Sequence, residues 1–210
     1  MSTLPVRPQI RFRRIAGAWT ISAAGSLSVN LVLYWVAHVV LAVPDRFQPL
    51  SGPVFVAAYT LLGTLGAALT LVLLTVINRC SLTVFRWSLA VAVFVLTLSA
   101  FILGTVAPIP ILAVVGLAAG AVFLSLAGHL WRRPLLAFQT VAGFMLLVSF
   151  VPDLSLLVGP AAERVARVWG PTPELVATLV AMHLCTALIT IGTLTAFLRA
   201  REEVSAWSAA

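Results

Sequence analysis

Six long apolar runs, separated by short polar segments, constrain the fold more than any other feature of this sequence. Each has roughly the 20 residues that an α-helix needs to cross the hydrocarbon core of a bilayer. The runs cover about residues 15–43, 53–78, 87–106, 111–130, 135–151 and 174–198. Only 9% of the residues are charged, whereas a soluble domain has about 25%. The sequence therefore predicts one all-α membrane domain, a polytopic integral membrane protein with six transmembrane helices.

The positions of the arginines predict the orientation of these helices. All 13 basic residues are arginines. Ten lie before the first run, between the second and third, between the fourth and fifth, or after the sixth, and three lie in the other segments. Because cytoplasmic loops are enriched in basic residues, both termini are expected in the cytoplasm, with the chain in the cell (plasma) membrane. The arginines form short clusters and no continuous basic face, so nucleic acid is not expected as a partner despite the net charge of +7.

The segment between the fifth and sixth runs has an amphipathic pattern over about residues 160–169. At helical spacing, Glu163, Arg164 and Arg167 fall on one side, and apolar residues fall on the other. This pattern predicts a short helix that lies on the outer face of the membrane.

A row of polar residues follows the first apolar run at steps of four. Its members are Ser22, Ser26, Asn30, Tyr34 and His38. Residues four apart lie on one ridge of a helix. A lipid-facing helix gains nothing from an asparagine and a histidine in such a row, so this ridge is expected to face protein, water or a ligand.

The sixth run carries a second polar stripe, in which His183 is followed at helical spacing by three threonines, the first of which is Thr186. At about 1.5 Å per residue, Tyr34 and His183 both lie roughly 14 Å below the outer boundary, and Asn30 is level with Thr186. We therefore expect the first and sixth helices to pack through a polar seam, with Tyr34 near His183. The seam is interpreted as packing by hydrogen bonds, with a ligand site as the alternative.

The candidate site consists of residues from these two stripes: Asn30, Tyr34, His38, His183 and Thr186. A haem held by His38 and His183 is not expected, because their depths differ by about five residues, roughly 7 Å. The sequence has no zinc-type cysteine spacing and no catalytic motif such as G-x-S-x-G or H-E-x-x-H. We therefore predict no metal, no cofactor and no catalytic residue.

Small residues at four-residue spacing predict close helix packing at two places. Gly116 and Gly120 lie on one face of the fourth run, and Gly63 and Ala67 lie on one face of the second. Such pairs let two helix backbones approach each other. The favoured interpretation is contact within the chain, and the alternative is the interface of a homo-oligomer.

Three short motifs resemble a family of small bacterial polytopic membrane proteins that has no assigned activity. They are Asn30 followed by Tyr34, then Phe85-Arg86-Trp87, then Met182-His183-Leu184. The family usually has four helices, and the resemblance covers the first three helices and the sixth. It implies no activity, but it implies that Asn30 and His183 belong to one shared feature.

Three classes of function are consistent with these patterns. No Asp, Glu, Arg or Lys lies well inside any predicted span, although ion-coupled carriers commonly have one there. We favour a structural or accessory membrane subunit, whose partners are the lipid bilayer and either a second copy or another membrane subunit. A small permease for a neutral or weakly polar solute is the alternative, and a cofactor-binding membrane enzyme is disfavoured.

Overall fold

The computed structural model describes residues 12–43, 50–104, 109–155 and 173–207, and every regular element in them is a helix. This confirms the all-helical class. The helices are α1 (Phe12–Val39), α2 (Pro53–Ile77), α3 (Leu82–Gly104), α4 (Ile109–Leu130), α5 (Pro134–Ser155) and α7 (Pro173–Trp207). The amphipathic helix predicted at 160–169 lies outside the described residues.

Four of the helices are long and apolar enough to cross a membrane. The apolar stretches are Arg13–Val39, Pro53–Ile77, Pro134–Val151 and Pro173–Phe197. In the described parts of α3 and α4, the apolar stretches Leu82–Leu98 and Val114–Leu130 are shorter. The length and composition of the four helices indicate a membrane protein.

Two helices are longer than their apolar runs. α5 continues through Pro152 to Ser155, past the predicted end at residue 151. Proline is tolerated inside membrane helices because neighbouring groups can satisfy the carbonyl that it frees. α7 continues to Trp207, beyond the predicted end at residue 198, and this extension contains Arg199, Arg201 and two glutamates.

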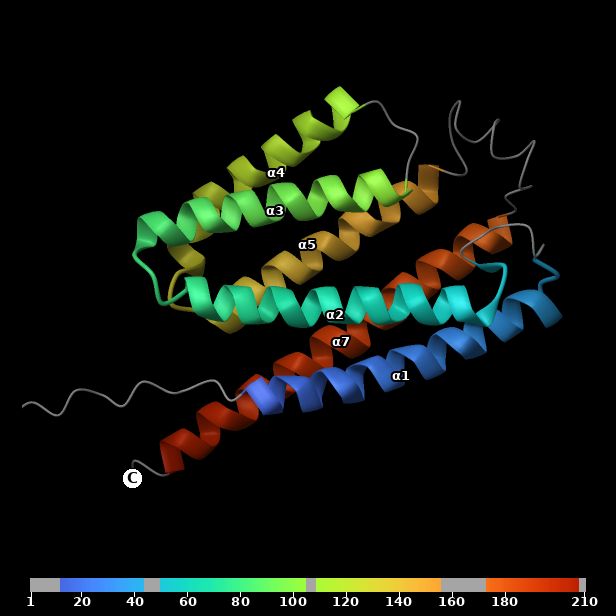
Figure 1. Cartoon of the computed structure of the whole chain (residues 1–210), viewed down its shortest axis with the longest axis horizontal. Coiled ribbons are helices and arrows are strands. Elements are labelled where there is room, and N and C mark those ends of the chain that lie inside the picture. Colours follow the sequence, from blue (N-terminus) through green and yellow to red (C-terminus); the bar gives the residue numbers. More distant parts are fainter. Residues whose placement is uncertain (1–11, 44–49, 105–108, 156–172, 208–210) are drawn as a thin grey trace, which may run out of the picture.

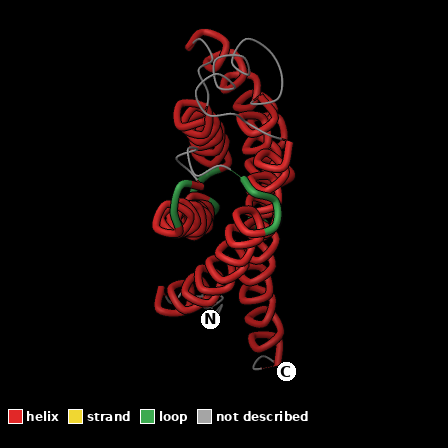
Figure 2. Tube along the Cα trace, turned by 90° about the vertical axis from the view of Figure 1, so that its right-hand side faces the viewer, coloured by secondary structure: helices red, strands yellow, loops and turns green. Residues whose placement is uncertain are grey.

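The helices pack as a bundle in which α5 lies between the pair α3 and α4 and the group formed by α1, α2 and α7 (Figure 1). α1 packs on α7 and on α2, α3 packs chiefly on α4, and α5 contacts α7, α3 and α2. Figure 2 shows the same helices turned by 90°, with short connections between them where the chain is described. The first and last helices of the chain therefore lie side by side.

One end of the bundle collects the arginines of the described segments. The start of α1, the α2–α3 and α4–α5 connections and the end of α7 lie at the left of Figure 1. The arginines in these parts, or in the first turns of the helix that follows, are Arg13, Arg14, Arg79, Arg86, Arg132, Arg133, Arg199 and Arg201. The two connections are joined there, because the indole Nε1 of Trp131 donates a 3.2 Å hydrogen bond to the carbonyl oxygen of Cys80.

Buried apolar residues form two main clusters. The larger one lies mainly among α2, α3, α4 and α5 around Phe85, Phe123 and Phe138, and also includes one residue each of α1 and α7. The second joins α1 to the start of α7, where Ala37 and Leu175 are fully buried. Together the clusters lie between the inner faces of the helices. Many large apolar side chains on the outer faces are exposed, as is usual for a surface that faces lipid.

The small residues of α4 lie against α3, whereas those of α2 do not all make the expected contact. A Cβ added at Gly120 would lie 3.3 Å from the carbonyl oxygen of Ala90, and one at Gly116 would lie 2.9 Å from Cδ2 of Phe94. Gly63 is exposed, and a Cβ there would meet nothing within 4 Å, although Ala67 packs against the larger cluster. Among the described residues, Gly63 therefore does not make the close contact within the chain that was expected.

Candidate functional site

Asn30 lies where three helices meet. Its side-chain amide Nδ2 donates one hydrogen bond to the hydroxyl of Thr60 on α2 and another to the hydroxyl of Thr186 on α7, each 2.8 Å long. An amide NH₂ group has two protons to donate, so both are used. Asn30 is only 4% exposed. We call Asn30, Thr60 and Thr186 the Asn30 junction, which ties α1 to both of its neighbours.

Thr60 was not predicted from the sequence as part of this site. Its hydroxyl donates to the carbonyl oxygen of Val56 in its own helix, at 2.7 Å, and its oxygen accepts from Asn30. A hydroxyl has one proton and two lone pairs, so both bonds are compatible. The signal available in the sequence was that Thr60 and Thr64 lie four residues apart, on one face of α2. In the structure both are buried.

The polar row continues along α1 from the Asn30 junction. Two turns away, the hydroxyl of Ser22 donates a 3.0 Å hydrogen bond to the hydroxyl of Thr190 on α7. Ser26 lies between Ser22 and Asn30. Its Oγ and the side-chain oxygen Oδ1 of Asn30 are buried and have no hydrogen-bond partner among the described residues. Two consecutive turns of α1 therefore present polar atoms that protein groups leave unsatisfied.

Tyr34 and His38 interact with each other within α1. Their ring centroids are 4.2 Å apart, and His38 Nδ1 lies 2.9 Å from the carbonyl oxygen of Tyr34. The half-buried Tyr34 packs against the apolar cluster that joins α1 to the start of α7. These two residues thus extend the contact with α7 mainly through apolar surface.

His183 has a polar partner that was not predicted from the sequence. Its Nδ1 lies 2.6 Å from Oδ2 of Asp153 on α5. This contact links α7 to α5 among the described residues, and the proximity of Tyr34 and His183 stays a prediction. The His183 side chain is 45% exposed and that of Asp153 is 9% exposed.

Asp153 was also missed, because Pro152 predicts the end of the fifth helix and so a loop position for the aspartate. In the structure Asp153 is buried within the last turns of α5. Asp153 lies two residues before the end of α5, so the sequence observation that no acidic residue lies well inside a span is unchanged. A second polar contact between the same helices, from Gln139 Nε2 to Thr195 Oγ1, is 3.4 Å long.

The chemistry available at these residues is limited. A carboxylate that accepts from Nδ1 fixes the tautomer and the orientation of an imidazole. Within the described segments no three His, Cys, Asp or Glu residues are grouped closely enough to hold a metal ion. Cys80 and Cys185 are free thiols. The arrangement is suited to hydrogen bonding between helices.

Comparison with known proteins adds no relative to this picture. No protein-family model, no curated protein and no solved structure matches the chain.

Proposed function

We propose that the chain is a structural or accessory subunit of the plasma membrane, which crosses the bilayer six times with both termini in the cytoplasm. The four apolar helices support a membrane location. The arginines gathered at one end of the bundle support the orientation, because basic residues favour the cytoplasmic side. Together with these four helices, α3 and α4 make up the six spans of this proposal.

The observation that carries the proposal is the Asn30 junction. Both amide protons of Asn30 are donated, and the Thr60 hydroxyl donates within its own helix α2. Ser22 of α1 donates to Thr190 of α7. Hydrogen bonds of this kind hold membrane helices together with about 0.6 kcal/mol each, and at most about 2 kcal/mol. Such a network stabilises one arrangement of α1, α2 and α7, as a subunit with a fixed surface requires.

Native mass spectrometry of the chain extracted from its own membrane in mild detergent tests this function. A structural subunit is expected in a complex of defined stoichiometry with a second copy or another membrane protein. An Asn30→Ala variant is expected to lose part of that complex, whereas Ser28→Ala, on the exposed face of the same helix, is expected to keep it. A monomer alone in both the parent and the variants would contradict the proposal.

A small permease for a neutral or weakly polar solute is the second candidate, and the His183–Asp153 pair favours it. Titratable groups inside membrane helices commonly mark solute or proton pathways. The unsatisfied oxygen of Asn30 and the hydroxyl of Ser26 add hydrogen-bonding groups on the neighbouring helix. Uptake of small polyols by proteoliposomes, abolished in His183→Ala, would favour this candidate over the structural one.

The resemblance to the family of small bacterial membrane proteins belongs to the same proposal. Asn30 and His183, which that resemblance joins in one feature, have different partners. They are related through α7, because Thr186 follows His183 by one helical turn. We therefore interpret the shared feature as the face of α7 that connects α1 with α5.

A further inference from the structure

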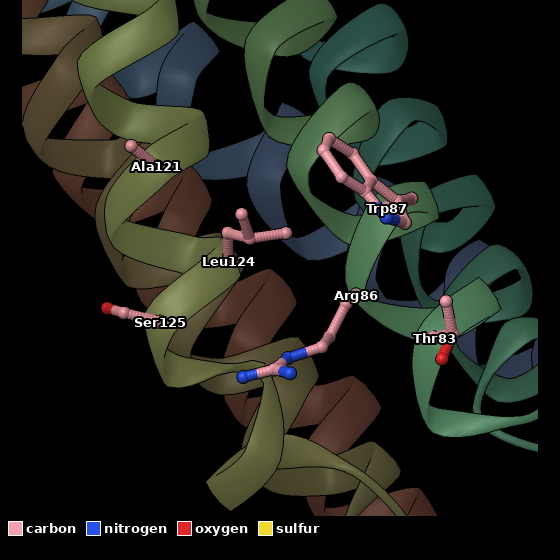
Figure 3. Close-up of a pocket in the computed structure, with 6 residues that line it drawn as sticks. All are labelled: Thr83, Arg86, Trp87, Ala121, Leu124 and Ser125. Atoms are coloured by element: carbon pink, nitrogen blue, oxygen red, sulfur yellow. The ribbon is translucent and has the colours of Figure 1, made fainter.

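We propose that a groove between α3 and α4 binds the head group of an anionic phospholipid. The groove has a volume of about 340 Å³ and is lined by Thr83, Arg86, Trp87, Ala121, Leu124 and Ser125 (Figure 3). Three of these residues come from α3 and three from α4, each set at spacings of three and four. The groove is thus built from one face of each helix, away from the Asn30 junction.

The charge in the groove is suited to a phosphate. The side chain of Arg86 extends from α3 toward α4 (Figure 3). A guanidinium group binds phosphate oxygens with two parallel hydrogen bonds. The sequence has no acidic residue between Asp45 and Asp153, so no carboxylate of this stretch neutralises Arg86.

A further arginine reinforces the positive potential at this end of the bundle. Arg132 lies in the α4–α5 connection, directly after α4, and its guanidinium carbon is 4.3 Å from the centre of the Trp131 ring. Basic pockets between helices on the cytoplasmic side are a recognised form of anionic-lipid site. An anionic ligand is therefore favoured over a neutral one.

The surface next to the groove is suited to the acyl chains. Trp87 is 62% exposed, and tryptophan at this level is typical of the interface between head groups and hydrocarbon. Val91 and Val95 follow it at steps of four and are also exposed, and Leu117 is exposed on α4 one turn before Ala121. This apolar path leads away from Arg86 along both helices, which is why we assign the site to a lipid and not to a soluble phosphate.

The inference rests on the proposed membrane crossing of α3 and α4, whose orientation is tested separately by thiol labelling. The lipid site is tested by native mass spectrometry of the full chain in detergent, with phosphatidylglycerol or phosphatidylcholine added. We expect phosphatidylglycerol to bind more tightly than phosphatidylcholine. Arg86→Gln is expected to weaken phosphatidylglycerol binding about tenfold, because a charge-assisted bond is lost, and to leave phosphatidylcholine binding unchanged.

Arg133→Gln is the matched control, since Arg133 is an exposed arginine at the same end that does not line the groove. It is expected to change phosphatidylglycerol binding less than twofold. Quenching of Trp87 fluorescence by brominated phosphatidylglycerol, measured as the difference between the parent chain and Trp87→Phe, gives a readout independent of Arg86. Equal losses in Arg86→Gln and Arg133→Gln, equal binding of the two lipids, absence of quenching, or displacement of the lipid by millimolar inorganic phosphate would each overturn the site.

Discussion

His183 of α7 and Asp153 of α5 are 30 residues apart in the chain, yet Nδ1 of the histidine lies 2.6 Å from Oδ2 of the aspartate. An ionised carboxylate can only accept, so the imidazole donates from Nδ1. The bond satisfies a buried carboxylate and joins α5 to α7. The His183 side chain is the more exposed partner of the pair.

Removing the histidine is expected to destabilise the bundle more than neutralising its partner. His183→Ala leaves the Asp153 carboxylate buried without this hydrogen bond, which costs about 1–3 kcal/mol. Asp153→Asn keeps an acceptor for Nδ1–H and is expected to cost less. Equilibrium unfolding in detergent measures both values.

The control for this comparison is His129→Ala, because His129 is exposed near the end of α4. It is expected to leave the unfolding free energy unchanged. If His183→Ala were as stable as His129→Ala, the pair would not contribute to stability.

The Asn30 junction makes a second prediction about stability. Asn30→Ala removes the donor of two interhelical hydrogen bonds and is expected to lower the unfolding free energy by about 1–4 kcal/mol, at up to about 2 kcal/mol per bond. Thr60→Val removes only one of the two acceptors, so its expected effect is smaller. The measurement is thermal or denaturant unfolding in detergent micelles.

Ser28→Ala is the control, since the exposed Ser28 hydroxyl donates only to Ala24 of its own helix among the bonds described. Its stability is expected to match that of the parent chain. A loss in Ser28→Ala as large as that in Asn30→Ala would show that the junction has no special role.

The apolar runs were sufficient to predict the helices, and helix geometry was sufficient to relate Asn30 to Thr186. Both residues lie in long helices of opposite direction, so counting 1.5 Å per residue from the boundaries gives their relative depth. Depth alone does not give the direction in which a side chain points about the helix axis. This is why the contacts of Tyr34 with His38, and of His183 with Asp153 on α5, were not predicted.

The parts of the site that were missed have local explanations. Threonines are frequent in membrane helices and often bond to their own backbone, as Thr60 does to Val56, so Thr60 carried no sign of a partner on α1. Pro152 was a plausible end for the fifth helix, because proline usually stops helices in water. In this bundle α5 continues through Pro152, so Asp153 belongs to the last turn of the helix.

The close approach of α3 and α4 predicts different effects for different glycines. Gly120→Ala is expected to cost about 1–3 kcal/mol, because the new Cβ would lie 3.3 Å from a backbone oxygen of Ala90, and one of the two helices would have to shift. Gly63→Ala and Gly128→Ala are expected to be neutral or slightly stabilising, since neither Cβ meets an atom within 4 Å. Unfolding measurements on the three variants decide this, and equal costs at all three positions would exclude a specific contact at Gly120.

The two cysteines allow a direct test of the proposed orientation. Cys80 is exposed in the α2–α3 connection, and Cys185 lies within α7. In Cys185→Ala, the remaining Cys80 thiol is expected to react with a membrane-impermeant maleimide only after the cells are opened, because this connection is proposed to face the cytoplasm. A chain with Cys80→Ala, Cys185→Ala and Leu41→Cys places the single thiol at the opposite end of the bundle, at a site that is 44% exposed. That thiol is expected to react in intact cells. Labelling of Cys80 in intact cells would reverse the proposed topology. The lipid groove would still be tested by the lipid-binding measurement.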